Sequence, residues 1–193
     1  MNATDSAKEW EELRRLLLAK SYAKKKVVLA SGRESDFYVD CRQTTLHGQG
    51  ARLVGRLLLE RIRASGARAV GGPTLGADPM ITAISLTAAL EGLELPAFII
   101  RKEAKGHGLG NRIEGMGNLA PGMKVAIVED VVTTAGSTLS AIEAAREAGL
   151  EVVKVLCLVD REEGGRENLA ARGFSLDALY TKTTLLGGRS ARP

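Results

Sequence analysis

Amphipathic helical segments and short, continuously apolar segments alternate along the chain from about residue 48 onward. The apolar periodicity predicts helices at residues 50–65, 79–90, 137–149 and 165–172. The apolar runs between them predict strands at residues 67–72, 96–102, 124–130, 151–160 and 176–181. Strands that are apolar throughout and alternate with helices form parallel sheets whose two faces are both covered. We therefore expect an α/β fold, with a central parallel sheet flanked by helices.

The first 46 residues follow a different pattern. Trp10, Leu13 and Leu17 recur at helical spacing, which predicts an amphipathic helix over residues 5–20. The segments KKVVLA and SDFYVDC, separated by SGRE, predict a small strand–turn–strand element. With 193 residues and no evident linker or internal repeat, the chain has the length of one domain. We expect a single domain over residues 1–193, with a hood at about 1–46 and a core at about 47–193.

Charge and hydropathy argue against several classes of partner. The formal net charge is only +4 and the basic residues are spread along the chain, so we expect no nucleic-acid partner. The N-terminal segment is charged where a signal peptide would be apolar, and no stretch approaches the ~20 apolar residues of a membrane span. Cys41 and Cys157 lack metal-ligand spacing, which fits buried free thiols. We expect a cytoplasmic protein with no membrane partner.

The segment VAIVEDVVTTAGST, residues 125–138, lies where a predicted strand meets a helix, and open parallel sheets bind ligands at such strand ends. The small residues before the helix favour a phosphate, because the amides and the dipole of a helix N-terminus attract negative charge. Glu129 and Asp130, just upstream, could accept hydrogen bonds from the two hydroxyls of a ribose. The segment therefore predicts a ribose 5-phosphate site. The alternative is a helix capped by Ser or Thr after a strand that happens to end in acids.

A second segment, RKEAKGHGLGNR at residues 101–112, is basic and too rich in glycine to form a stable helix. One interpretation is a cationic lid that closes over a departing diphosphate and stabilises the negative charge that grows on it. The other is a solvated charged hairpin. Composition alone does not decide between the two.

Several of these segments resemble those of a known family. The apolar run, the Glu-Asp pair and the Thr-Thr loop with its small residues are similar to the phosphoribosyl diphosphate motif of the type I phosphoribosyltransferases. SGRESDFYVD, RKEAKGHG with the later IEG, and LVDREEGG resemble the orotate phosphoribosyltransferases in particular, and these segments are spread over most of the chain, from residue 31 to residue 165. The resemblance implies transfer of a phosphoribosyl group from 5-phosphoribosyl 1-diphosphate (PRPP) to orotate. The products would be orotidine 5′-monophosphate and diphosphate, in de novo pyrimidine synthesis.

The resemblance also implies roles for individual residues. PRPP binding falls on the motif itself, that is on Glu129, Asp130, Val131, Val132, Thr133, Thr134, Ala135, Gly136 and Ser137. Diphosphate binding and catalysis fall on the basic residues that match, namely Arg101, Lys102, Lys105 and His107. Orotate contacts fall on Thr133 and Arg161. A guanidinium suits a carboxylate because it can bind it bidentately, but Arg161 could instead be a surface residue of the DREE cluster.

A cofactor and an assembly are implied in the same way. Mg²⁺ is expected, because the charge of a diphosphate is normally met by a divalent cation that keeps several waters. No carboxylate cluster in the sequence looks like a dedicated metal cage, so we expect the metal to be held through the substrate rather than by protein ligands. The resemblance further implies a homodimer in which the lid of each subunit reaches into the active site of its neighbour.

Two positions depart from the family pattern. Relatives carry a lysine directly before SGR and another in the loop that here reads GGPTLGADP, whereas this chain has Ala30 and Gly76. Either nearby cations such as Lys26 and Arg33 replace them, or the protein binds diphosphate with fewer fixed charges and depends more on its lid. Asp78 in that loop could cap the next helix, or the loop amides could bind diphosphate. Two other functions stay open: a phosphoribosyltransferase for another base, and a ligand-sensing regulator of this fold, which would normally add a DNA-binding segment.

Overall fold

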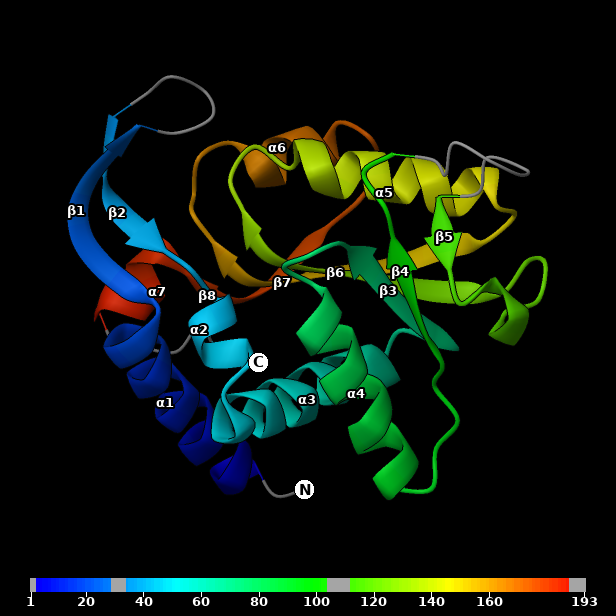
Figure 1. Cartoon of the computed structure of the whole chain (residues 1–193), viewed down its shortest axis with the longest axis horizontal. Coiled ribbons are helices and arrows are strands. Elements are labelled where there is room, and N and C mark those ends of the chain that lie inside the picture. The colour runs from blue at the N-terminus through cyan, green and yellow to red at the C-terminus, as the bar shows by residue number, and fades with distance from the viewer. Residues whose placement is uncertain (1–2, 29–33, 104–111, 188–193) are drawn as a thin grey trace.

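A computed structural model of the chain describes residues 3–28, 34–103 and 112–187. Within these ranges it has a six-stranded sheet and a separate two-stranded hairpin (Figure 1). The sheet order is β5-β4-β3-β6-β7-β8, built from β3 (Ala69–Pro73), β4 (Ala97–Ile100), β5 (Ile113–Glu114), β6 (Lys124–Val132), β7 (Glu151–Asp160) and β8 (Leu176–Thr181). All neighbouring strands pair in parallel except β4 and β5. The predicted α/β fold with a central, mostly parallel sheet is confirmed.

Alternate residues of the strands supply the two faces of the sheet. On one face, α1 (Ala3–Lys20), α3 (Gly48–Arg63) and α4 (Asp78–Leu90) share a core with Ala126 and Val128 of β6. On the other face, α5 (Gly136–Glu147) and α6 (Gly165–Ala170) share a core with Val125 and Ile127. Figure 1 shows these helical layers on opposite sides of the sheet. A strand covered on both faces must be apolar along its length, which is why the sequence pattern identified β6.

The first helix is fixed to the last strand. The ring centroids of Trp10 and Tyr180 lie 4.6 Å apart. Trp10 Nε1 donates a hydrogen bond to the Leu179 carbonyl at 3.0 Å, and the Tyr180 hydroxyl donates to the Trp10 carbonyl at 2.6 Å. Both polar groups are therefore satisfied inside an apolar contact, and α1 has a defined position on β8.

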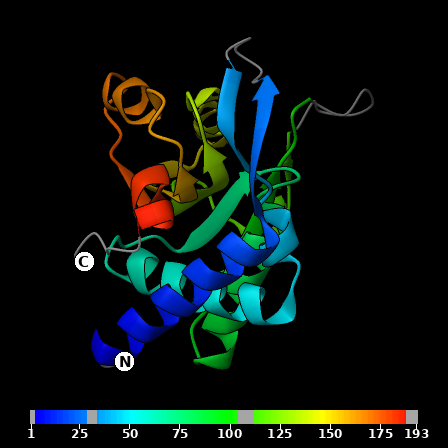
Figure 2. The same ribbon diagram turned by 90° about the vertical axis from the view of Figure 1, so that its left-hand side faces the viewer.

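The hairpin of the hood consists of β1 (Tyr22–Val28) and β2 (Glu34–Val39), which pair antiparallel. It rises from the end of α1 beside the carboxyl ends of the parallel strands (Figure 2). Phe37 of β2 is only 1% exposed, so this residue belongs to the core. The first strand begins at Tyr22, three residues before the segment that the sequence indicated. The hairpin therefore places the hood beside the carboxyl ends of the parallel strands.

Several short elements escaped the sequence analysis, namely α2 (Arg42–Thr45), β5, the 3-10 helix η1 (Met116–Asn118) and α7 (Lys182–Gly187). Segments of two to six residues are too short to display a period. Strand β6 also continues to Val132, so Glu129 and Asp130 lie within the strand rather than at its end. In the described part of the chain, no helix combines the length and apolar character that crossing a membrane would need.

Candidate active site

The strand order reverses direction between β3 and β6. From β3 the chain passes to β4 on one side, and then places β6 on the other side of β3. Open α/β sheets bind ligands in the crevice outside the carboxyl ends of two such strands. A cavity of about 1220 Å³ lies there. Its lining comes from the ends of β3, β4 and β6, the start of α5 and the β2 strand of the hood.

The two neighbouring acids of β6 line this cavity. Glu129 is 7% exposed, and its Oε2 accepts hydrogen bonds from Ser137 Oγ at 3.0 Å and Thr138 Oγ1 at 2.9 Å. Burial raises the pKa of Glu129 to about 7, although the two hydroxyls act in the opposite direction. Burial also raises the pKa of Asp130, whose Oδ1 accepts from the Val131 amide at 2.9 Å. Two desolvated carboxyls therefore stand side by side where a ligand could offer them hydroxyl donors.

The turn from β6 into α5 has the backbone arrangement of an anion site. Ala135, directly before the helix, has φ of 65°, a left-handed conformation that costs a residue with a side chain ~1 kcal/mol. The first hydrogen bond of the helix runs from the Leu139 amide to the Ala135 carbonyl at 2.9 Å. The amides of residues 136–138 thus precede the hydrogen-bond ladder of the helix. Such amides are the groups that bind phosphate at helix N-termini.

The cavity is lined by only part of the predicted PRPP motif. Glu129, Asp130, Val131 and Ser137 are among its lining residues. Val132 is 1% exposed and belongs to the core below α5. The remaining motif residues, Thr133, Thr134, Ala135 and Gly136, form the turn beyond the cavity lining. The motif therefore divides into two parts. Glu129 and Asp130 form an acidic wall of the cavity, and residues 133–136 form the turn that leads into the helix.

The loop after β3 packs against this acidic wall. A Cβ atom at Gly76 would overlap the carboxylate of Asp130, so a lysine does not fit there unless the acid moves. Asp78 does not cap α4, since Ala77 is the residue before the helix and no side chain caps its amides. Instead, Asp78 Oδ2 accepts from Thr74 Oγ1 at 2.9 Å, while the buried Oδ1 lacks a hydrogen-bond partner among the described residues. The capping alternative is thus wrong. Ala30 and Arg33 lie outside the described residues.

The basic segment begins and ends at the mouth of the cavity. Arg101, Lys102 and Arg112 are lining residues, whereas Lys105 and His107 lie outside the described residues. The Arg101 amide donates to the Arg112 carbonyl at 2.8 Å, and Arg112 Nε donates to the Arg101 carbonyl at 3.1 Å. Arg112 Nη2 also donates to Ser140 Oγ at 3.0 Å, on α5. Both ends of the segment are therefore fixed beside each other and beside the acidic wall.

The two candidate orotate contacts come from adjoining strand ends. The Arg161 amide donates to the carbonyl of Val132, the residue before Thr133, at 2.9 Å. Arg161 is 8% exposed, so it is not the surface arginine of the alternative interpretation. Its Nε donates to Glu163 Oε1 at 3.0 Å and its Nη2 to the Phe37 carbonyl at 3.1 Å. Neither Arg161 nor Thr133 is among the lining residues of the cavity.

Sequence reasoning missed an ion pair on the hood side of the cavity. Asp40 and Arg42 follow β2 and line the cavity together with Tyr38 and Val39. Arg42 Nε donates to Asp40 Oδ1 at 2.8 Å, and this hydrogen bond lowers the pKa of Asp40. The signal that could have found the pair was the DCR triplet, because charged residues at the end of a predicted strand point to a strand-end site. The segment that follows the hairpin therefore contributes a cation, Arg42, that no motif indicated.

The described lining carries more acids than bases. The acids are Asp40, Asp78, Glu103, Glu114, Glu129 and Asp130, and the bases are Arg42, Arg101, Lys102 and Arg112. A polyanionic ligand in this cavity would need positive charge beyond these bases, from a cation that accompanies it or from other residues. Within residues 3–28, 34–103 and 112–187, no three His, Cys, Asp or Glu side chains are grouped so that they could hold a metal ion.

Comparison with known proteins gives consistent results. Residues 43–181 match the family model described as phosphoribosyl transferase domain. The orotate phosphoribosyltransferase of Sorangium cellulosum is 50% identical over 177 residues, which cover 91% of this chain and 92% of that protein. The orotate phosphoribosyltransferase of Rhodopirellula baltica is 40% identical over 187 residues, covering 94% and 96%. The crystal structure of the Mycobacterium tuberculosis orotate phosphoribosyltransferase in complex with PRPP superposes with a TM-score of 0.76 at 37% identity, covering 92% of this chain and 98% of that one.

Proposed function

The chain belongs to the orotate phosphoribosyltransferases of the phosphoribosyl transferase domain family, and on that premise we propose how its residues share the reaction. It is a pentosyl transferase that moves the phosphoribosyl group of PRPP to orotate in pyrimidine biosynthesis. The observation that carries this conclusion is the identity of 40–50% over most of the chain with proteins of that one activity. These relatives favour orotate over another base, and an enzyme over a regulator.

The β6–α5 segment binds the ribose 5-phosphate part of PRPP. The amides of residues 136–138 precede the helix ladder and donate hydrogen bonds to the phosphate, with Thr133, Thr134, Ala135 and Ser137 shaping the turn around it. Glu129 and Asp130 accept hydrogen bonds from the two ribose hydroxyls. Support comes from their burial, since a desolvated carboxyl gains more from hydrogen-bond donors than a solvated one does.

The basic segment binds the diphosphate and stabilises its departure. In the reaction the bond from C1 of the ribose to the diphosphate oxygen breaks, and the electron pair leaves with the diphosphate. Orotate forms the new bond to C1 through a ring nitrogen, and the proton of that nitrogen passes to the departing diphosphate. Arg101 and Lys102 stand at the mouth of the cavity, and Lys105 and His107 lie a few residues further along the segment. Cations there stabilise the charge that develops on the leaving oxygens.

Mg²⁺ fits this site as a companion of the substrate. The residues present suit it, because the described lining has a surplus of carboxylates, and Mg²⁺ binds through one or two carboxylates, waters and substrate phosphates. When bound, the ion neutralises charge on the diphosphate. Asp130 of β6 and Asp78, the first residue of α4, are the lining acids that would meet its water shell. The chain's own contribution is to hold the sugar and the leaving group in place.

Thr133 and Arg161 bind orotate. Arg161 is joined to the end of β6 through the Val132 carbonyl and to the hood through the Phe37 carbonyl, next to Tyr38 in the cavity lining. A base held between Tyr38 and Arg161 would thus lie at the edge of the cavity that holds the ribose. The guanidinium supplies the charge that the orotate carboxylate needs.

A homodimer with shared active sites fits an apolar face on α4. Leu86 and Leu90 lie one turn apart and are 59% and 80% exposed, and Leu75, which lines the cavity, is 67% exposed. Exposed leucines on one face of a helix favour an association surface there. A partner that covers these leucines would reach the rim of the cavity. A cytoplasmic location fits the two buried free thiols, Cys41 and Cys157.

The activity test is to mix the protein with Mg²⁺, PRPP and orotate and follow the loss of orotate absorbance. Lys105→Ala should lower turnover about a hundredfold or more, because a cation at the leaving group is lost, with little change in the free energy of unfolding. A variant that unfolds or keeps full activity contradicts the role of the basic segment.

Shared sites are tested by mixing two inactive variants, Lys105→Ala and Asp130→Asn. If the lid of one subunit completes the site of its partner, mixed dimers contain one site with both intact parts, and about a quarter of the activity returns. If the two variants form no mixed dimers, or if the mixture is as inactive as either variant alone, the result argues against the shared site.

Leu90→Lys, which places a charge on the apolar face, should shift the sedimentation of the protein toward the monomer.

A further inference from the structure

The turn after β7 contains a residue in an unusual backbone conformation. Glu162 has φ of 59°, and a left-handed conformation is disfavoured for residues other than glycine. Such a conformation persists only where the surrounding contacts determine it. Glu162 directly follows Arg161, so whatever fixes this turn also fixes where the arginine side chain leaves the backbone.

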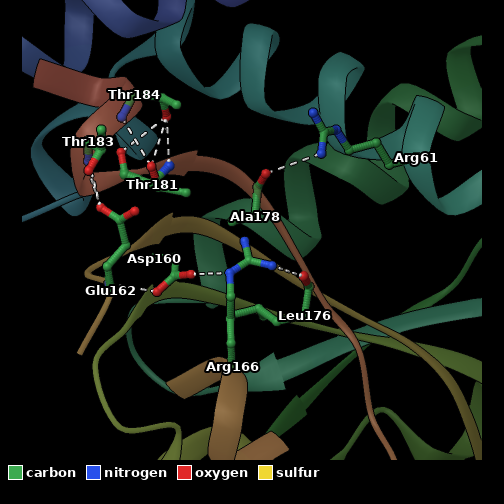
Figure 3. A network of polar contacts seen from close by, with 9 residues as sticks. All are labelled: Arg61, Asp160, Glu162, Arg166, Leu176, Ala178, Thr181, Thr183 and Thr184. Carbon is green, nitrogen blue, oxygen red and sulfur yellow. Dashed lines mark hydrogen bonds and ion pairs between the residues drawn. The ribbon is translucent and has the colours of Figure 1, made fainter. Parts of the chain in front are cut away.

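One set of contacts is made by Asp160, the last residue of β7, directly before the turn. Asp160, with 0% exposure, accepts the Glu162 amide on Oδ1 at 2.8 Å and Arg166 Nε on Oδ2 at 2.7 Å. Arg166 Nη1 in turn donates to the Leu176 carbonyl of β8 at 2.8 Å. Figure 3 shows this path from Glu162 through Asp160 and Arg166 to Leu176. The base of the turn is therefore fastened to the last strand.

A second set comes from the C-terminal helix. Glu162 Oε2 accepts hydrogen bonds from the Thr183 amide at 2.8 Å and from Thr183 Oγ1 at 2.7 Å. The first turn of α7 is itself held by Thr181 and Thr184, since the Thr181 amide donates to Thr184 Oγ1 at 2.8 Å and the Thr184 amide donates to Thr181 Oγ1 at 3.1 Å. All of these groups gather at one corner of Figure 3.

Helix α7 also reaches the Phe37 ring, against which the Arg161 guanidinium lies. Lys182 Nζ lies 5.4 Å from the centroid of the Phe37 ring, and the Arg161 guanidinium carbon lies 5.6 Å from it. Arg161 Nη2 donates to the Phe37 carbonyl. Thus α7, the turn after β7 and the hood hairpin meet at Phe37, and the arginine lies at their junction.

From these contacts we infer that Glu162 and Thr183 are positioning residues, which hold the turn after β7 and aim the Arg161 guanidinium at the carboxylate of orotate. The inference rests on the proposed role of Arg161 in orotate binding. It gives the C-terminal helix, which lies outside the matched family domain at residues 43–181, a part in substrate selection. Because Glu162 is exposed, replacing it should leave the core intact.

The test compares steady-state constants for both substrates. Glu162→Ala should raise the KM for orotate about tenfold, as expected for losing hydrogen bonds to a charged acceptor, and leave the KM for PRPP within about twofold. Glu162→Gly removes the same carboxylate but relieves the backbone, and should behave like the alanine variant. Thr183→Val should raise the orotate KM about threefold, and Thr183→Ser, which keeps the hydroxyl, should restore it. Glu167→Ala, which removes an exposed acid from nearby α6, is the charge control and should change neither KM.

A double-mutant cycle separates positioning from general support of the fold. In an Arg161→Ala background, Glu162→Ala should have no further effect on the orotate KM, because the group through which it acts is gone. An equal effect in both backgrounds, a parallel rise in both KM values, or a normal orotate KM in Glu162→Gly overturns the inference. If Arg161→Ala alone leaves the orotate KM unchanged, the orotate assignment itself fails. If Arg161→Ala raises it while Glu162→Ala and Thr183→Val do not, only the positioning role fails.

Discussion

Two buried acids stand near the ends of neighbouring strands, Glu129 in β6 and Asp160 in β7, and their surroundings differ. Asp160 is paired with the Arg166 guanidinium at 2.7 Å and also accepts a backbone amide. Glu129 is met by two hydroxyls, and burial raises its pKa to about 7. The acid that supports the fold is neutralised by a cation of its own chain. The acid at the cavity carries a desolvation cost that a ligand with hydroxyl donors would offset.

The largest expected effect follows from the neutralised acid. Asp160→Ala should lower the free energy of unfolding by about 3 to 4 kcal/mol, because it leaves Arg166 and the Glu162 amide without their acceptor. Urea denaturation followed by circular dichroism measures the change. Glu129→Gln is the matched control on the other strand, and at pH 8 it should not destabilise the protein. A loss below about 1 kcal/mol for Asp160→Ala would remove the distinction between the two acids.

The second effect is a pH dependence that belongs to Glu129. Its pKa is raised from 4.5 when exposed to about 7 when folded, so the stability linked to its protonated form is complete below about pH 4.5 and is lost as the pH rises through 7. The loss is on the order of 3 kcal/mol, because each pKa unit corresponds to about 1.4 kcal/mol. The stability of the wild-type protein relative to Glu129→Gln should fall over this window, which urea titrations between pH 4 and 8 would reveal. A difference that stays constant with pH would mean that burial does not penalise the charge.

A smaller effect tests the close packing of the acidic wall. Gly76→Ala places a methyl group where the Asp130 carboxylate now lies, so the acid must shift away from its position. We expect kcat/KM for PRPP to fall about tenfold, equivalent to about 1.4 kcal/mol, with the orotate KM nearly unchanged. Gly117→Ala is the control, because no atom lies within 4 Å of its added Cβ. Equal activity of the two variants would show that Asp130 tolerates displacement.

The two strand ends also differ in how much of their structure could be predicted from the sequence. The buried strands stood out as continuous apolar runs between helices with an apolar period, and the Glu129-Asp130 pair stood out because acids are rare in an apolar run. Arg42 was missed because its partner lies two residues away in an unremarkable triplet. The contact between Glu162 and Thr183 spans 21 residues and involves a helix of six. Neither a hydrophobic period nor a sequence motif predicts such a contact, because the contact depends on how two chain segments pack in space.

The smallest expected effect concerns a third kind of acid, one on the surface. Glu143 of α5 pairs with Arg172 after α6 at 3.4 Å, and the side chains are 59% and 62% exposed. Water screens this pair and both side chains lose freedom on pairing, so Glu143→Gln should change the free energy of unfolding by less than about 0.5 kcal/mol. The change should shrink further in 0.5 M salt, at which the Debye length is about 4 Å. Urea denaturation at low and high salt measures both values. A loss comparable to that of Asp160→Ala would show that ion pairing itself, rather than burial, separates the structural acids from those of the cavity.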